Sequence, residues 1–304
     1  MENFVIIIIY LLIGVFLKAT KRLPENFSNS LNLFVIYVSL PALVLLRIPS
    51  MEISSELMFV AALPWVMVVL GSVMVLLFSR MLGWEKEVIG CLLLMVALGN
   101  TSFLGIPMVK AFFGEDAIAY AVIYDQLGSF LALATYGSLV LAFFASRKEA
   151  TPKPWEILTK ILSFPPFIAL VVALFIRNIT YPQFVLSILK SLGATLVPVV
   201  MIAVGHQLCI RLEAGTLKAL MAGLIMKLCA APLLALLIVK LFGLHGPSVE
   251  VAVFEAGMPP MVSAGALAIM AGLSPGLTAA LVGAGIFLSF LTLPVLFEII
   301  KLVI

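Results

Sequence analysis

The chain has 304 residues, of which 63% are hydrophobic and 11% charged, and its formal net charge is +3. Soluble domains are typically about half apolar and about a quarter charged, so this composition excludes an ordinary soluble domain. The mean hydropathy is +1.25, and apolar stretches of about 20 residues recur along the chain, enough to cross about 30 Å of hydrocarbon. We therefore expect one polytopic membrane domain over residues 1–304, with no nucleic-acid partner.

The first apolar run, residues 3–18, lacks a basic segment before it and a small-residue cleavage site after it. Its positive charges follow the apolar run, an order typical of a retained first helix and not of a signal peptide.

Hydropathy and helix-breaking residues predict an all-α protein with ten membrane spans. The sixth span is short, and the segment before it, "PKPWEILTKIL", is typical of a helix lying along the membrane interface. The predicted spans are 3–18, 31–48, 57–79, 88–113, 117–145, 164–177, 184–208, 217–242, 248–272 and 275–301.

Lysine and arginine are unevenly distributed between the two sets of loops. The loops after the odd-numbered spans hold eleven: Lys18, Lys21, Arg22, Arg80, Lys86, Arg147, Lys148, Lys153, Lys160, Arg211 and Lys218. The opposite face holds five: Arg47, Lys110, Arg177, Lys240 and Lys301. Because cytoplasmic loops carry the excess of basic residues, we expect a multi-pass protein of the plasma or inner cell membrane. Both termini would lie outside, and a short linker, about 146–156, would be cytoplasmic.

The two halves of the chain share prolines and glycines at a nearly constant offset. Pro41 and Pro198 are 157 residues apart, and Gly99 and Gly257 are 158 apart. The stretch "ALGNTSFLGIPMVKAFFGED" therefore aligns without a gap on "EAGMPPMVSAGALAIMAGLS". The offset predicts a duplication of about 1–146 and 156–304. Five spans per copy is an odd number, so the copies would be inverted, an arrangement found in transporters.

The aligned stretches break the fourth and ninth spans with glycine, proline and polar residues. Pro107 has no N–H and is expected to interrupt the first helix by clashing with the carbonyl of Phe103. Each break would begin a half-helix whose free amides attract an anion, the two breaks crossing at mid-membrane. The alternative is that both are kinks that only shape packing. The candidate substrate-binding residues are Asn100, Thr101, Ser102, Gly105, Pro107, Gly257, Met258, Pro259, Pro260 and Ser263; Pro41 and Pro198 are expected to be structural breaks.

Asp125, Glu255, Lys190 and Lys227 lie well inside predicted spans, where a charge is costly and needs a role. Lys190 is expected to extend to the membrane surface. Asp125 and Glu255 are candidates to bind a proton or help hold a sodium ion; the alternative is a structural hydrogen bond for each. Lys227 would either neutralise one of these acids or extend to the membrane surface.

No catalytic pattern is present: the sequence has no HExxH motif, no acidic metal cluster and no Ser/His/Asp set, and its only histidines are His206 and His245. The three cysteines lie in or beside apolar spans and are interpreted as packing residues. We therefore expect no enzyme activity, no cofactor and no metal site, with proton or sodium coupling left open.

Three motifs resemble the auxin efflux carrier family of the bile acid/arsenite/riboflavin transporter superfamily. They are "LNLFVIYVSLPALVLLRI", "GNTSFLGIPMVKAFFGEDAIAYAVIYD" and the Pro-Pro of "EAGMPPMVSAGALAIMAGLSP". The resemblance implies a ten-helix, five-plus-five inverted-repeat fold, like that of sodium/proton antiporters and bile-acid symporters, with crossing spans 4 and 9. It also implies elevator-type export or exchange of an organic anion, auxin-like or malate- or malonate-like.

We therefore expect a secondary transporter of a small organic carboxylate in the lipid bilayer. Spans 1, 2, 6 and 7 would form a scaffold and the contact of a homodimer, and the remaining spans would move. One alternative is a sodium-coupled symporter of bile-acid-like anions. Another is a membrane receptor that binds the anion without moving it.

Overall fold

A computed structural model describes the chain except residues 1, 25, 52–55, 146–152, 178 and 209–214, so most of the predicted linker lies outside the described residues. The described part is helical throughout and contains no named strand, only one isolated antiparallel bridge between Gly99 and Pro260. The all-α prediction is confirmed.

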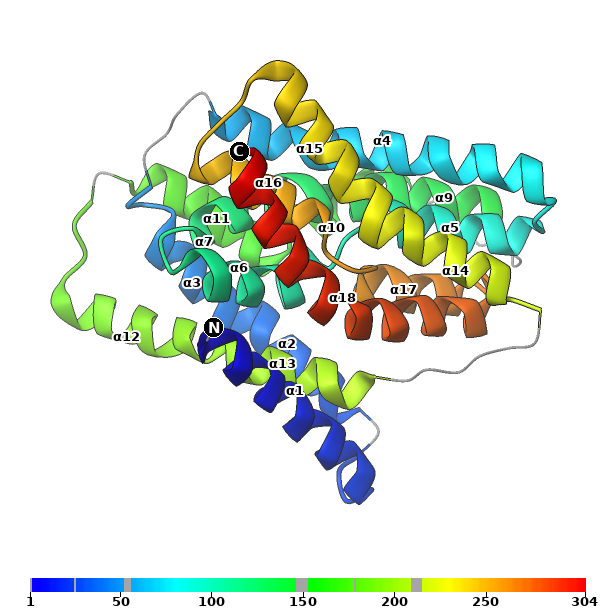
Figure 1. Ribbon diagram of the computed structural model, residues 1–304. Helices are drawn as coiled ribbons and strands as arrows, with labels where there is room; N and C mark the ends of the chain where they lie inside the picture. Colours follow the sequence, from blue (N-terminus) through cyan, green and yellow to red (C-terminus); the bar gives the residue numbers. More distant parts are fainter. Residues whose placement is uncertain (1, 25, 52–55, 146–152, 178, 209–214) are drawn as a thin grey trace. The chain divides into compact units, whose positions relative to one another are not determined.

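The helices follow one another with short connections (Figure 1). The first half contains α1 (Glu2–Thr20), α2 (Phe27–Phe34), α3 (Leu40–Arg47), α4 (Glu56–Leu82), α5 (Lys86–Ala97), α6 (Ile106–Phe113), α7 (Ile118–Ile123), α8 (Phe130–Ala132) and α9 (Ser138–Phe144). The second contains α10 (Pro154–Leu162), α11 (Pro165–Phe175), α12 (Gln183–Ala194), α13 (Leu196–Gln207), α14 (Leu217–Ile225), α15 (Ala231–Phe242), α16 (Pro247–Ala256), α17 (Val262–Met270) and α18 (Pro275–Val303). Five π-helical segments lie among them: η1 (Val35–Ser39), η2 (Thr101–Gly105), η3 (Tyr124–Ser129), η4 (Leu133–Gly137) and η5 (Met226–Ala230).

Within the described ranges, seven helices are long and apolar enough to cross a membrane, and the count rises to eight if α10 and α11, bent by 64°, form one span. The predicted fourth and ninth spans are not among them, because each is interrupted. The first stops at Ala97 and resumes at Thr101, and the second stops at Ala256 and resumes at Val262. A multi-pass membrane protein is thus supported, while the ten-span inverted repeat stays a prediction.

The helices around Pro41 and Pro198 are irregular just before each proline. The π-helical segment η1 runs directly into α3, so Pro41 lies inside one continuous helix over Phe27–Arg47, with the irregular hydrogen bonding just before it. Thr195 separates α12 from α13, three residues before Pro198. The hydroxyls of Ser39 and Thr195 lie 2.8 Å apart and are hydrogen-bonded, so the two irregular points lie side by side.

The chain forms two compact units. Unit 1 comprises Met1–Ser54, Ser102–Val122 and Leu158–Leu208. It therefore contains the spans expected to form a scaffold, 1, 2, 6 and 7, together with Ser102–Val122, which had been expected to belong to the other group.

Glycines bring two helices of unit 1 into backbone contact. Helix α1 packs along α13 (Figure 1). A Cβ at Gly205 would lie 2.1 Å from the carbonyl oxygen of Leu11, and one at Gly14 would lie 2.2 Å from that of Ile202. Only residues without a side chain fit there.

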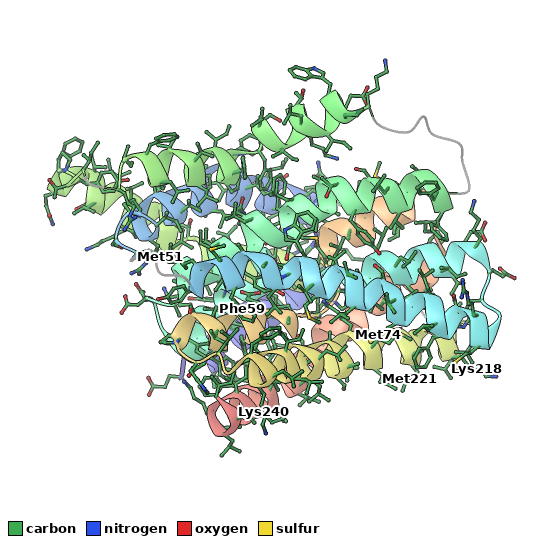
Figure 2. The ribbon with its side chains drawn as sticks, turned by 90° about the horizontal axis from the view of Figure 1, so that it is seen from above. Met51, Phe59, Met74, Lys218, Met221 and Lys240 are labelled. Carbon is green, nitrogen blue, oxygen red and sulfur yellow. The ribbon has the colours of Figure 1, made fainter. Side chains whose placement is uncertain are left out.

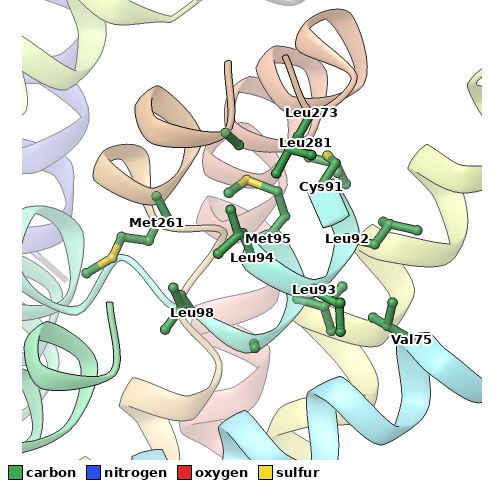
Figure 3. Close-up of a cluster of buried hydrophobic side chains, with 14 of the residues drawn as sticks. Val75, Cys91, Leu92, Leu93, Leu94, Met95, Leu98, Met261, Leu273 and Leu281 are labelled. Atoms are coloured by element: carbon green, nitrogen blue, oxygen red, sulfur yellow. The ribbon is translucent and has the colours of Figure 1, made fainter. Parts of the chain in front are cut away.

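Unit 2 comprises Ser55–Thr101, Ile123–Ile157 and Cys209–Ile304. Its core surrounds α5, which is buried continuously from Gly90 to Ala97, as expected of a helix that is apolar on every face. Side chains of α5 contact Leu273 and Leu281 near and within α18 (Figure 3). Helix α4 packs against α15, and Lys218 and Lys240 lie at opposite ends of the pair α14–α15 (Figure 2).

We expect Gly205→Ala to lower the stability of unit 1, because its methyl group would force α1 and α13 apart. Overpacking of this kind costs about 1–3 kcal/mol, measurable as a lower thermal unfolding midpoint in detergent. Gly193→Ala is the matched control, since a Cβ there would lie 3.5 Å from its nearest neighbour, an ordinary contact. Equal midpoints for the two variants would contradict this account.

Candidate functional site

The two helix breaks of unit 2 are hydrogen-bonded to each other. The N–H of Asn100 donates to the carbonyl of Pro259 at 2.8 Å, and the N–H of Met261 donates to the carbonyl of Leu98 at 3.1 Å. Gly99 and Pro260 lie between these bonds and form the antiparallel bridge; Leu98 and Met261 are labelled in Figure 3. Because an unpaired backbone group in hydrocarbon costs several kcal/mol, each break stabilises the other.

The second break also has few donors to satisfy. The N–H of Gly257 bonds to the carbonyl of Phe254, and that of Met258 bonds to the carbonyl of Glu255. Pro259 and Pro260 have no N–H, and the N–H of Met261 is used by Leu98. Every backbone donor from residue 257 to 261 is therefore either paired or absent, which is the physical reason for two adjacent prolines at this point.

Pro107 does not make the first break, contrary to expectation. The helix is interrupted at Leu98–Asn100, and Pro107 lies further on, in the first turn of α6 after the π-helical segment η2. Because η2 runs directly into α6, Pro107 lies inside one helix over Thr101–Phe113, and the π-helical pattern just before it is an irregularity of the kind a proline produces. By its contacts, the segment from Ser102 through Gly105 to Pro107 belongs to unit 1.

The remaining candidate substrate-binding residues lie in unit 2 and are mostly buried. Pro260 packs closely against Gly285 of α18, where a Cβ would lie 2.6 Å from the proline ring. Ser263 lies in the first turn of α17 and is half-buried. Helix α17 begins at Val262 and η2 begins at Thr101, so the first-turn N–H groups of both elements have no partner within their own helix.

Asp125 is held beside the first break. It is fully buried in η3, and its Oδ1 accepts a hydrogen bond from the hydroxyl of Thr101 at 2.5 Å. Its Oδ2 accepts one from the side-chain amide of Gln126 at 2.6 Å. The segment η3 is itself held on α4, because Trp65 Nε1 donates to the carbonyl of Leu127 at 3.0 Å.

Glu255 lies at the end of α16, next to the second break, and is 1% exposed. Both of its carboxylate oxygens are buried without a hydrogen-bond partner in the described part of the chain, as are the side-chain nitrogen of Asn100 and the side-chain oxygen of Gln126. Buried polar atoms are normally paired. Asn100, Gln126 and Glu255 therefore each carry at least one buried polar atom without a partner. Such atoms on or beside the two breaks indicate a candidate site for a polar ligand.

Lys227 is buried and does not extend to the membrane surface. It is 3% exposed, lies in η5, and interacts electrostatically with Glu255. A Cβ at Gly99 would lie only 3.3 Å from the Lys227 Nζ. The glycine at the first break therefore makes room for an ammonium group, a role that its place in the sequence did not indicate.

A cavity of about 10 Å³ is lined by Gly99, Lys227 and Glu255, whereas Asn100, Asp125 and Gln126 are not among its lining residues. This is room for about one water molecule, so an organic anion does not fit in this conformation. Tyr124 and Ser129 also line the cavity, and no sequence signal distinguished them from ordinary helix residues. The cavity is lined by Pro64, Met67, Val68, Ala97, Leu98, Gly99, Thr101, Tyr124, Ser129, Lys227, Glu255 and Ala256.

Among the described residues, no group of three or more His, Cys, Asp or Glu side chains is placed to hold a metal ion. Counted formally, Asp125 and Glu255 contribute two negative charges and Lys227 one positive charge, a balance of −1. One monovalent cation or one proton would neutralise the cluster.

Paired helix breaks and buried charges in a multi-pass helical protein are the features of a membrane transporter, and comparison with known proteins agrees. Residues 1–297 match the family model described as membrane transport protein. An uncharacterized transporter of Methanocaldococcus jannaschii is 29% identical over 269 residues, 85% of each chain. An uncharacterized transporter of Methanothermobacter thermautotrophicus is 26% identical over 298 residues, 96% of each chain. The chain belongs to the membrane transport protein family, which is the auxin efflux carrier family of the resemblance.

We expect Lys227→Met and Glu255→Gln to interact in their effects on stability. The first leaves two buried carboxylates without their ammonium, which is strongly destabilising, and adding the second removes one of those charges. The double variant should recover part of the loss, with a coupling energy of about 0.5–3 kcal/mol, measured by thermal unfolding in neutral detergent. Lys240→Met, at the exposed end of α15, is the control. Strictly additive effects would contradict the proximity of the two charges.

Proposed function

We propose that this protein is a secondary active transporter of a small organic carboxylate, working by alternating access. The observation that carries the proposal is the pair of mutually bonded helix breaks beside buried, partly unpaired charges in one unit. Membership of a family of membrane transport proteins supports it. The substrate class, auxin-like or malate- or malonate-like, comes from the family resemblance.

The carboxylate would bind at the half-helix amides that remain free. Two of the expected donors, the N–H groups of Asn100 and Met261, are already used in the pairing of the breaks. The first turn of α17, which begins at Val262, remains, together with the unpaired side-chain nitrogen of Asn100, and both belong to unit 2. Helix N-termini favour anions, and the Asn100 amide would orient the bound carboxylate.

The size of the cavity fits an occluded conformation. At about 10 Å³ it admits no organic anion, so the substrate would bind only after the site opens. Both breaks, Asp125, Lys227 and Glu255 all belong to unit 2. We propose that unit 2 carries the site in an elevator-type movement, while spans 1, 2, 6 and 7 of unit 1 form the fixed scaffold and the contact of a homodimer.

The proposed membrane topology completes this mechanism. We propose ten spans formed by two inverted repeats, about 1–146 and 156–304. The protein would lie in the plasma or inner cell membrane with both termini outside, as the excess of basic residues in the odd-numbered loops supports.

Ion coupling is the second candidate function, and the charge balance of the site favours it. The cluster of Asp125, Glu255 and Lys227 has a formal balance of −1, so an anion could not join it without a neutralising charge. Sodium or proton symport would supply that charge on the two unpaired oxygens of Glu255. Asp125 is less suited, because Thr101 and Gln126 already donate to its carboxylate.

The combined variant Asn100→Ala, Pro259→Ala should lower carboxylate flux at least about tenfold. It removes the amide donor and adds an unpaired N–H to the second break, and one hydrogen bond to a charged group contributes about 1.5–3 kcal/mol. The measurement is uptake of labelled malonate and indole-3-acetate into proteoliposomes, with the exposed residue change Gln183→Ala as control. Unchanged flux would refute the site, and saturable binding without any flux in the native protein would favour a receptor.

Glu255→Gln should abolish the dependence of flux on a cation gradient while exchange of anion across the membrane continues, because the amide cannot take up a proton or hold sodium as a carboxylate does. Flux is compared under an inward sodium gradient, an inward proton gradient and neither. The exposed Glu298→Gln, on α18, is the matched control. Native flux indifferent to both gradients would eliminate coupling and leave uniport or exchange.

A further inference from the structure

A second and much larger cavity lies wholly within unit 1. Its volume is about 460 Å³, within the range of small-molecule sites. We call it the α3–α12 cavity. Its lining residues are Leu43, Leu46 and Arg47 of α3, Lys110 of α6, Glu115 and Ile118, and Lys190, Gly193 and Ala194 of α12.

The charges of the α3–α12 cavity are mainly positive. Among the lining residues Arg47, Lys110 and Lys190 are opposed by Glu115, a formal balance of +2. The exposed Asp116, outside the lining, lies 3.9 Å from Arg47 and lowers the balance to +1 when it is counted. The chain has only 18 basic residues in all, so three around one cavity is a marked concentration. Charge of this sign attracts anions.

Glu115 shows that these cations accept a carboxylate. The guanidinium of Arg47 contacts one carboxylate oxygen of Glu115, and Lys110 Nζ lies 3.0 Å from the other. The Glu115 side chain is 54% exposed, and exposed ion pairs contribute little to stability. A free carboxylate could therefore take its place at Arg47 and Lys110 at small cost.

Two nitrogen donors of the cavity-lining residues are not used by Glu115. The Nε of Arg47 is buried without a hydrogen-bond partner. Lys190 has no carboxylate within 4.0 Å among the residues that the structure describes. These two groups are a second place for an anionic group, while Leu43, Leu46 and Ile118 provide an apolar wall.

We propose that the α3–α12 cavity is a binding site for a small dicarboxylate, distinct from the site at the helix breaks. One carboxylate pairs with Lys190 and the Arg47 Nε, and the other displaces the carboxylate of Glu115 from Lys110. The carbon chain between them packs on the apolar wall. Two separate donor sets match a ligand with two carboxylates, and a monocarboxylate satisfies only one set.

The test is titration calorimetry of the full-length protein with succinate, in nanodiscs of uncharged lipid at constant ionic strength. Neutral lipid removes anionic headgroups as competitors, and constant ionic strength is needed because salt screens exposed charges. The background is Asn100→Ala, which removes a donor of the other proposed site and none from this cavity.

Lys190→Gln should weaken succinate binding about tenfold, the loss expected for a charge-assisted hydrogen bond. Glu115→Gln should instead tighten it several-fold, because the internal competitor loses its charge. Lys190 is exposed, so its replacement does not threaten folding. Lys218→Gln, an exposed lysine of unit 2, is the matched control and should leave binding unchanged. Acetate should bind at least about tenfold more weakly than succinate, since it engages a single donor set.

No saturable succinate binding, or binding that neither Lys190→Gln weakens nor Glu115→Gln tightens, would overturn the proposal. Equal affinity for acetate and succinate would overturn it too. The result of this binding experiment can be interpreted independently of the transport experiment. Binding with the expected variant effects would support this site even if the protein carried no carboxylate, whereas flux without such binding would leave transport intact and remove this site.

Discussion

The mutual hydrogen bonding of two interrupted helices is the constraint on which the rest of unit 2 depends. A helix that stops inside hydrocarbon leaves backbone groups that neither water nor lipid can satisfy. Here Asn100 bonds to Pro259 and Met261 bonds to Leu98, so each break supplies the partners that the other lacks. Neither interruption would be tolerable alone. The close approach also explains the glycines, since Gly99 leaves room for Lys227, and Gly285 leaves room for Pro260.

The irregular backbone places the polar side chains as well. Thr101, Asp125 and Lys227 each lie in a π-helical segment, η2, η3 and η5. Such segments occur frequently at functional sites. The result is a buried cluster whose charges do not cancel, in a protein with few other buried charges. Burying such groups is costly, and the family's transport role gives a physical reason for retaining them.

Much of this arrangement could be predicted from the sequence. The parts that could not be predicted all have the same cause, which is contact between residues far apart in the chain. The breaks near Gly99 and Gly257, and the placement of Asp125 and Glu255 inside apolar spans, followed from apolar runs interrupted by polar residues. Pro107 was expected to disturb the helix near the break, and the π-helical segment η2 does lie directly before it. The break itself lies earlier, at Leu98–Asn100, where its position is set by pairing with the other break, a contact between distant parts of the chain.

By itself the sequence determined that this is a helical membrane protein and that two of its apolar stretches are interrupted. Those properties follow from local composition, since the bilayer requires apolar side chains and helical hydrogen bonds along every span. The tertiary structure alone decided which backbone groups pair across the breaks. It also decided that Lys227 joins the acids instead of reaching the surface, and that Arg47, Lys110 and Lys190 surround one cavity. These are consequences of packing between residues far apart in the chain, for which one sequence carries no local signal.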